Sequence, residues 1–265
     1  IYKILLNHKM IEYYKEPGIT PLEFINTVKK EFPDKKICYT ARLDPMARGL
    51  IPILFGEDCK LMNLYTCLSK TYEVKVIIGL ATDTDDAMGL ITQNTLNTSN
   101  QNISFNQTTS FNQTTSFNQN TSHYILSNYK SIFEIENELT LNQKYHYYST
   151  KALLSRSKNN FDNHYHSVKL YHSSVIDSGE LDFNMWKNEC INTINKVDKT
   201  KEYRQNEIIK QWNDLSNEIK APLHYITLQL YVSSGFFIRQ YIRDISEKIG
   251  IPLMCYDINR VNINY

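Results

Sequence analysis

Two segments of the chain alternate between hydrophobic and polar positions, which predicts β-strands. Residues 72–78 alternate and are rich in β-branched side chains, and Gly79 marks the end of this strand. Residues 226–232 alternate in the same way, and residues 167–172 are also strand-like. Because successive side chains of a strand point to opposite faces, we expect these strands to be half buried.

Other segments place their apolar residues at helical spacing. In residues 21–32 this spacing predicts a helix, with Thr20 as its N-cap and Pro21 at its first position. A second helix is predicted over residues 237–249, ended by a glycine and a proline, and residues 186–220 predict one or two surface helices. Strands and helices mix without regular βαβ alternation, so the pattern favours an α+β fold.

A polar tract interrupts these segments. No charged residue occurs from 91 to 122, and a six-residue unit, Ser-Phe-Asn-Gln-Thr-Thr, occurs at 104–109 and again at 110–115. So few apolar groups cannot offset the entropy of ordering, so we expect a disordered surface insertion at about residues 92–122. Strand-like segments lie on both sides, and we therefore predict a single domain over residues 1–265, interrupted by this insertion.

Composition and charge exclude several classes of protein. The chain has 265 residues, 29 Lys+Arg against 28 Asp+Glu, and a formal net charge of +1, which argues against a broad electrostatic nucleic-acid binder. No apolar run approaches the roughly 18–20 residues of a membrane-spanning helix, so no membrane segment is predicted. The 5 cysteines include no pair with metal or redox spacing, and we expect reduced thiols in an intracellular compartment that the sequence does not specify.

A local basic region is present despite the neutral total. Residues 143–170 contain more Lys and Arg than acidic residues, interleaved with tyrosines. Basic groups for phosphates and aromatic rings for bases are the composition expected of an RNA-binding groove, and an ordinary solvated face is the alternative.

The segment over residues 39–52 holds a carboxylate in a stiff loop. Asp44 precedes Pro45, which disfavours a helical conformation, and lies between Arg42 and Arg48. A hydrogen-bonded turn with no further role is the alternative for this aspartate.

Two further segments contain candidate functional groups. The acidic turn at residues 79–89 follows the strand that opens at Lys70, and it lacks the final glutamate of a calcium-binding loop, so we expect it to shape a cleft. Gly235 stands at a strand-to-helix junction, followed by Arg239 near the helix start. A cation there opposes the helix dipole, so Arg239 needs an anionic partner, whether in a functional site or in a structural ion pair.

Five short motifs occur along the chain in a fixed order. They are Lys-x-x-Gly-x-Thr at 15–20, Ala-Arg-Leu-Asp-Pro-x-Ala-x-Gly at 41–49, Lys-x-Tyr at 70–72 with the acidic turn at 79–89, Gln143 to Lys151, and Ser234 to Arg239. In this order they resemble the TruB family of tRNA pseudouridine synthases. The chain departs from the family pattern at Tyr39, where a histidine is usual, and at Phe237, where a tyrosine is usual.

The resemblance implies a fold and an activity. The fold is that of pseudouridine synthases, a mixed and mainly antiparallel sheet flanked by helices. The activity is isomerisation of a uridine in RNA, in particular the T-arm uridine of tRNA, by base flipping and without a cofactor or metal. It also implies a protein that acts as a monomer. A catalytically silent RNA-binding chaperone of the same fold is the main alternative, and a metal-dependent phosphotransferase that uses the acidic turn is a more distant one.

The resemblance also implies roles for individual residues. Asp44 acts on the ribose, either by attacking C1′ or by removing the 2′ proton. Tyr72 stacks on the flipped uracil and helps to remove the C5 proton, and Arg239 completes the catalytic trio. Arg239 is the candidate for the guanidinium beside the aspartate, and Arg42, which is peculiar to this chain, is the second candidate. The residues expected to bind substrate or RNA are Tyr39, Arg42, Arg48, Lys70, Asp83, Asp85, Tyr148, Lys151 and Ile258.

Overall fold

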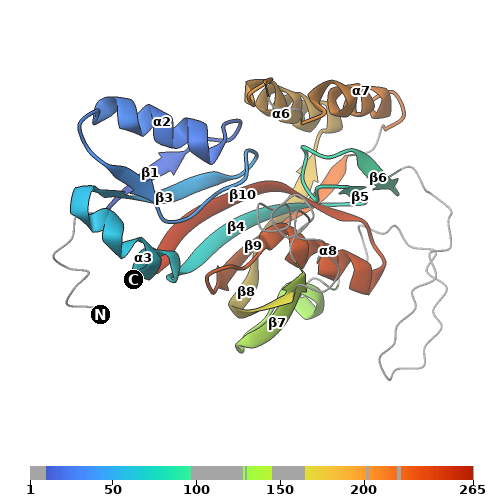
Figure 1. Ribbon diagram of the computed structural model, residues 1–265. Coiled ribbons are helices and arrows are strands. Elements are labelled where there is room, and N and C mark those ends of the chain that lie inside the picture. The colour runs from blue at the N-terminus through green and yellow to red at the C-terminus, as the bar shows by residue number, and fades with distance from the viewer. Residues whose placement is uncertain are drawn as a thin grey trace.

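The computed structural model describes residues 10–96, 128, 130–144, 165–200, 203–219 and 222–264. A large sheet dominates this part of the chain, and helices cover both of its faces (Figure 1). The strands are β1 (Met10–Lys15), β2 (Ile37–Tyr39), β3 (Arg48–Phe55), β4 (Ser69–Ile78), β5 (Leu80–Thr82), β6 (Ile91–Asn94), β7 (Leu139–Lys144), β8 (Tyr165–Leu181), β9 (Leu223–Val232) and β10 (Leu253–Asn264). The helices are α2 (Pro21–Glu31), the 3₁₀ helix η1 (Gly56–Leu61), α3 (Met62–Thr66), α6 (Phe183–Lys196), α7 (Gln205–Leu215) and α8 (Ile238–Ile249).

The sheet has 8 strands in the order β1-β3-β10-β4-β9-β8-β7, with β2 paired to β3. Neighbouring strands run antiparallel, apart from the short parallel pairing of β10 with β3. Strands β5 and β6 form a separate two-stranded sheet. The predicted α+β class, with a mixed and mainly antiparallel sheet, is confirmed.

The predicted helices begin and end close to where the local signals place them. Thr20 caps α2 in a reciprocal capping box, since its hydroxyl accepts from the Glu23 N–H at 3.2 Å and the Glu23 carboxylate accepts from the Thr20 N–H at 2.7 Å. Helix α8 ends at Gly250, whose φ of 69° is the left-handed conformation that favours glycine.

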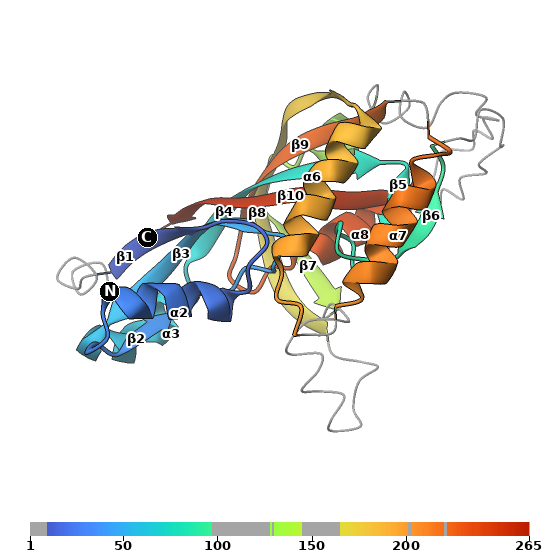
Figure 2. The same cartoon turned by 90° about the horizontal axis from the view of Figure 1, so that it is seen from above.

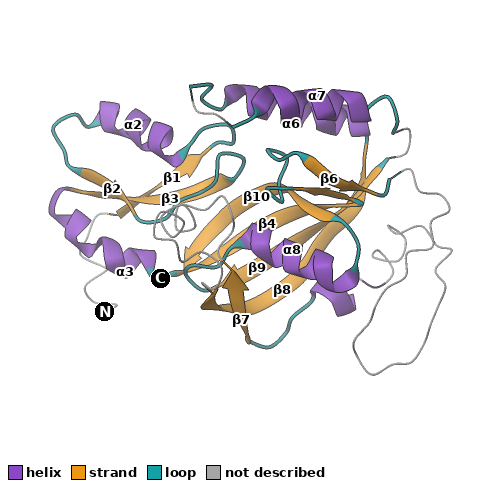
Figure 3. Ribbon diagram, turned by 45° about the vertical axis from the view of Figure 1, so that its right-hand side comes forward, coloured by secondary structure: helices purple, strands orange, loops and turns teal. Residues whose placement is uncertain are grey.

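The sheet separates two hydrophobic cores. On one face, β4 contributes Val74 and Val76 to a core shared with α8 and α2. On the other face, Ile77 packs with α6 and α7, whose buried Trp186 and Trp212 meet edge to face at 4.9 Å. Figures 2 and 3 show α6 and α7 lying over the strands on the face opposite α8. The helices expected at the surface over residues 186–220 are therefore α6 and α7, which are amphipathic and pack their apolar faces on the second core.

Strand β10 lies in the middle of the sheet, and the hydrophobic pattern did not predict it. Two register shifts against β4, between Cys255 and Asp257 and between Arg260 and Asn262, interrupt its alternation. Each bulge moves the following side chains to the other face, so the sequence shows no clean period of two.

The polar tract does not begin as a loop. Its first residues, Ile91–Asn94, form β6 and pair with β5, so the predicted boundary at residue 92 was wrong. Backbone hydrogen bonds to β5 offset the poor apolar content of these few residues. The rest of the predicted insertion, from residue 97, lies outside the described residues. Within the described part of the chain, no helix is long and apolar enough to cross a membrane.

Candidate active site

Asp44 lies on a loop between β2 and β3, and a buried lysine holds the backbone of this loop. Lys15, at the end of β1, is fully buried, and its ammonium donates to the carbonyls of Asp44 (3.3 Å), Pro45 (3.3 Å) and Ala47 (2.6 Å). Burial lowers the pKa of Lys15 to about 8, although Asp44 opposes this shift. The cation thus fixes the path of the loop through its carbonyls.

A close contact between β3 and β10 anchors the other side of the loop. Gly49 has a φ of 119°, and a Cβ there would come within 2.4 Å of the Arg260 carbonyl oxygen, so only glycine fits. The Arg260 guanidinium donates from Nε to the Leu50 carbonyl at 2.6 Å and from Nη1 to the Arg42 carbonyl at 3.3 Å. Both ends of the loop are therefore fixed by buried cations.

Arg239, in the first turn of α8, bridges two carboxylates. Its Nη2 lies 2.8 Å from Oδ2 of Asp44, and its Nη1 lies 3.1 Å from Oδ2 of Asp86 and donates to the Thr84 carbonyl at 2.9 Å. Burial works to lower the pKa of Arg239, but the neighbouring aspartates outweigh it and hold the pKa above its ordinary value. The anionic partners expected for a cation at a helix start are present.

Asp86 is the buried member of this group. Its side chain is 7% exposed, and its Oδ1 accepts from the Thr84 hydroxyl at 2.7 Å and from the Met88 N–H at 2.9 Å. Burial raises its pKa, and Arg239 opposes the rise. The Asp44 side chain is 49% exposed, so the carboxylate that faces solvent is the one on the loop.

The other acidic side chains of the turn point to other arginines. Asp83 takes a two-pronged contact from Arg204, with its shorter distance 2.6 Å, and Asp85 accepts from Arg243 at 2.8 Å. Asp85 has a φ of 60°, which is the left-handed conformation. Aspartate adopts this conformation more readily than most residues other than glycine. The turn is thus tied to three arginines from outside it, and Asp86, together with the Thr84 carbonyl, connects it to Asp44 through Arg239.

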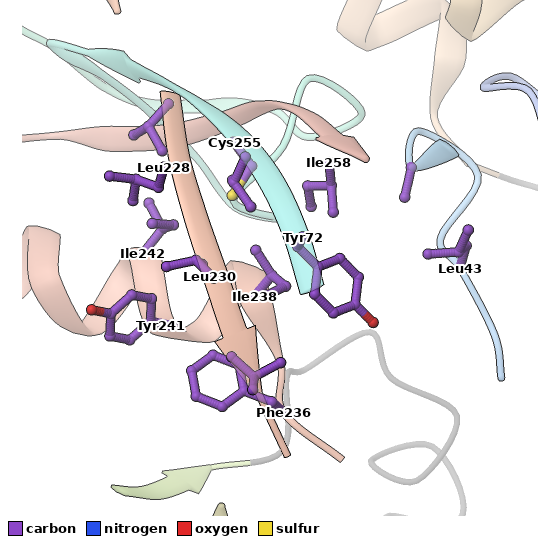
Figure 4. Packing of buried hydrophobic residues seen from close by; sticks show 14 of the residues in the cluster. Leu43, Tyr72, Leu228, Leu230, Phe236, Ile238, Tyr241, Ile242, Cys255 and Ile258 are labelled. Atoms are coloured by element: carbon purple, nitrogen blue, oxygen red, sulfur yellow. The ribbon is translucent and has the colours of Figure 1, made fainter. Parts of the chain in front are cut away.

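A cavity of about 840 Å³ opens over Asp44. Several of the predicted residues line it together, namely Tyr39, Arg42, Asp44, Lys70, Tyr72, Arg239 and Ile258. Figure 4 shows the Tyr72 ring, near the start of β4, with Ile258 beside it and Leu43 across from it. The three side chains are at least nine-tenths buried and form an apolar floor next to the carboxylate.

The lining of the cavity is positively charged. Asp44 is the only carboxylate among the described residues that line it, against Arg42, Lys70, Arg239 and Arg260. Lys70 is 5% exposed and donates to the Thr66 carbonyl at 2.8 Å. Burial, followed by the charge of Arg260, lowers its pKa to about 8. Such a lining attracts an anionic ligand.

Three predicted substrate-binding residues lie outside the cavity. Arg48 makes a double contact with Asp257, the shorter distance being 2.7 Å, and donates to the Tyr14 hydroxyl at 3.0 Å. Asp83 and Asp85 pair with the arginines described above. The side chains of these three residues form ion pairs with residues of other strands and helices. They therefore point away from the cavity. Tyr148 and Lys151 lie outside the described residues.

Sequence reasoning missed the buried groups that support the site. The sequence analysis did not single out Arg260, and it included Lys15 only as the first residue of a motif. Asp86 stood in an acidic cluster whose members cannot be told apart without knowing which arginine each one meets. The only available signal was the spacing of the acidic turn. No three or more His, Cys, Asp or Glu side chains gather as a metal site within the described ranges.

The fold is that of pseudouridine synthases. Two solved structures superpose on this chain, one described as an H/ACA RNP bound to a substrate RNA containing 2′-deoxyuridine and one as a Cbf5-Nop10-Gar1 complex. Their TM-scores are 0.50 and 0.51 at 12% and 13% identity, and they cover 99% and 98% of this chain and 50% of each matched chain. At this identity the likeness concerns the fold alone.

Sequence comparison finds similarity to one family over part of the chain. Residues 29–132 match the model of the TruB family pseudouridylate synthase N-terminal domain. The chain is similar to tRNA pseudouridine synthase B of Blochmanniella pennsylvanica, with 42% identity over 77 residues, and of Oceanobacillus iheyensis, with 33% identity over 86 residues. These alignments span 29% and 32% of this chain, and 30% and 28% of the relatives' own length. Residues 29–132 are thus similar to a TruB-family N-terminal domain, which confirms the resemblance inferred from the motifs.

Proposed function

We propose that this protein isomerises a uridine in RNA to pseudouridine, with the T-arm uridine of tRNA as its substrate. The observation that carries the proposal is the Asp44 carboxylate, half exposed in the cavity and held at 2.8 Å by Arg239. The curated relatives are named tRNA pseudouridine synthases, which favours tRNA as the RNA. We further propose that residues 1–265 act as one catalytic domain and as a monomer.

The proposed chemistry moves one glycosidic bond. The bond from N1 of uracil to C1′ of the ribose breaks, the base turns, and a bond from C5 to C1′ forms. C5 loses a proton and N1 gains one, so the isomerisation is redox-neutral and the proposal includes no cofactor or metal. Asp44 acts on the ribose, because it is the carboxylate that faces the cavity.

The apolar floor suits a base taken out of its stack. Unstacking a base costs about a few kcal/mol, which stacking on an aromatic ring offsets. Tyr72 presents such a ring beside Ile258, and its hydroxyl is the group we assign to removal of the C5 proton. The basic lining of the cavity is suited to the phosphates that flank the flipped nucleotide.

Release of tritium from tRNA labelled at C5 of uridine tests the proposal. The C5 hydrogen leaves only when the base is reattached through carbon. We expect release by the wild-type protein, and none above background for Asp44→Asn. Asp214→Asn is the matched control, because this carboxylate is 64% exposed on α7 and pairs with Lys210 outside the cavity lining. RNA binding without release by the wild type would support the silent RNA chaperone instead.

A further inference from the structure

A buried glutamine on β7 contacts the helix that carries Arg239. Gln143 is fully buried, and its side-chain amide pairs with both backbone groups of Phe237. Its Nε2 donates to the Phe237 carbonyl at 3.0 Å, and its Oε1 accepts from the Phe237 N–H at 2.8 Å. The two residues are 94 positions apart in the chain, so the contact is purely tertiary.

Phe237 is the residue from which α8 begins. It is the N-cap of the helix, with an extended backbone and no side-chain cap of its own, and its carbonyl accepts the helical bond from the Tyr241 N–H at 3.0 Å. Arg239 follows two residues later and reaches Asp44. The glutamine amide therefore holds the point from which the direction of Arg239 is set.

Other residues of the β7–β8 strand pair contact the rest of the loop between β9 and α8. His166, opposite Gln143 in the β7–β8 register, places its Nε2 2.8 Å from the Gly235 carbonyl oxygen, and its ring meets Phe237 edge to face at 4.9 Å. Further along β8, Lys169 exchanges two hydrogen bonds with Ser233, each 2.9 Å long. Residues 233–239 line the cavity, so this end of the β7–β8 pair supports one wall of the site.

The chemistry of the Gln143 side chain indicates that it orients the backbone of Phe237, in addition to filling space. A fully buried amide gives up its hydration, and an apolar side chain of the same length would fill the space without that cost. Only the amide satisfies a peptide N–H and a peptide carbonyl at once, in one geometry. We propose that Gln143 is a positioning residue of the active site, which holds the start of α8 so that Arg239 meets Asp44. This inference rests on the proposed function.

Replacing Gln143 by methionine keeps the length of the side chain and removes both hydrogen bonds. We expect Gln143→Met to lower kcat for tritium release by about tenfold to a hundredfold, since small misplacements of reacting groups have effects of this size. The KM for tRNA should change by less than about twofold, because Gln143 does not line the cavity. Gln211→Met is the matched control. Gln211 lies on α7, its side chain accepts a hydrogen bond from the Ile91 N–H at 2.8 Å, and it does not line the cavity.

A double-mutant cycle distinguishes positioning from general damage. If Gln143 acts through Arg239, then Gln143→Met should have no further effect on kcat in an Arg239→Ala background. Additive effects would show that the two side chains act independently, and so would overturn the proposal. So would a Gln143→Met protein with wild-type kcat.

Gln143→Glu gives a second test with nearly the same shape. A protonated carboxyl group can donate to the Phe237 carbonyl and accept from its N–H, whereas a carboxylate can only accept. The kcat of Gln143→Glu relative to wild type should therefore rise as the pH is lowered, and that of Gln143→Met should not. Both variants keep His166 and Lys144 beside residue 143 in the β7–β8 pair. A pH effect that came from these neighbours would therefore be the same in both variants.

Hydrogen exchange without RNA tests the inference apart from any activity. The amides of residues 237–241 should exchange at least about tenfold faster in Gln143→Met than in wild type or Gln211→Met. Unchanged exchange would refute the role of Gln143 even if the wild type were inactive. Absence of tritium release from the wild type, with faster exchange in the variant, would refute the proposed function alone.

Discussion

Arg239→Ala separates the stability of the site from its chemistry, because the arginine contacts two carboxylates of different exposure. Loss of the contact with Asp44, which is 49% exposed, should cost little stability, as exposed pairs contribute about 0–1 kcal/mol. Asp86 is 7% exposed and would be left as a buried charge, a change that typically costs about 3–5 kcal/mol. The bonds from Thr84 and Met88 remain, so we expect a loss of about 3 kcal/mol near pH 7.

The loss should depend on pH with a definite sign. Burial already raises the pKa of Asp86 above the ordinary aspartate value, and removal of Arg239 takes away the group that opposes the rise. The folded variant then binds a proton that the unfolded chain does not, so its stability falls as the pH rises above the ordinary aspartate range. Urea unfolding at pH 5 and pH 8 should show a larger deficit relative to wild type at pH 8.

A second substitution makes the reasoning falsifiable. Asp86→Asn keeps an oxygen for the bonds from Thr84 and Met88 but removes the charge, so Arg239→Ala/Asp86→Asn should recover most of the lost stability. Tritium release should stay at least about a hundredfold below wild type, because Asp44 is still not held in place. Equal unfolding free energies for wild type and Arg239→Ala at pH 8 would refute the reasoning, as would recovery of turnover in the double variant.

Other substitutions test the surroundings of the site. Gly49→Ala should lower the free energy of unfolding, measured by calorimetry, by more than about 2 kcal/mol, because φ is positive and a Cβ would approach β10 to 2.4 Å. Gly56→Ala is the control: a Cβ there would have no atom within 4 Å, so the loss should be about 1 kcal/mol. Arg48→Ala should leave kcat and KM for tritium release unchanged and cost at most about 1 kcal/mol, since its pair with Asp257 is partly exposed; a large fall in kcat would return Arg48 to the site. In wild type, the lowered pKa of Lys70 means that the folded state releases a proton first, so this group makes stability rise from about pH 8 towards 10.5. Lys70→Met should weaken that rise in urea unfolding, and an unchanged pH profile would contradict the assignment.

Features that depend on a few neighbouring residues could be predicted from the sequence. Thr20 and Pro21 mark the start of α2, the alternation before Gly79 marks β4, and Gly250 ends α8, because caps, pleats and left-handed turns are local. The ordered motifs also singled out Asp44 as the candidate carboxylate, and the place of Arg239 near a helix start predicted that it needs an anionic partner.

Features that depend on distant partners were decided only by the tertiary structure. Strand β10 has an interrupted alternation and owes its central place to pairing with β4 and β3. Nothing local distinguishes Asp86 from Asp83 and Asp85, and the three differ in the arginine that each meets. The same holds for Lys15 and Gln143, whose partners are backbone groups of distant segments. Local conformational preferences are encoded within a few residues, whereas burial and charge pairing depend on which segments the folded sheet brings together.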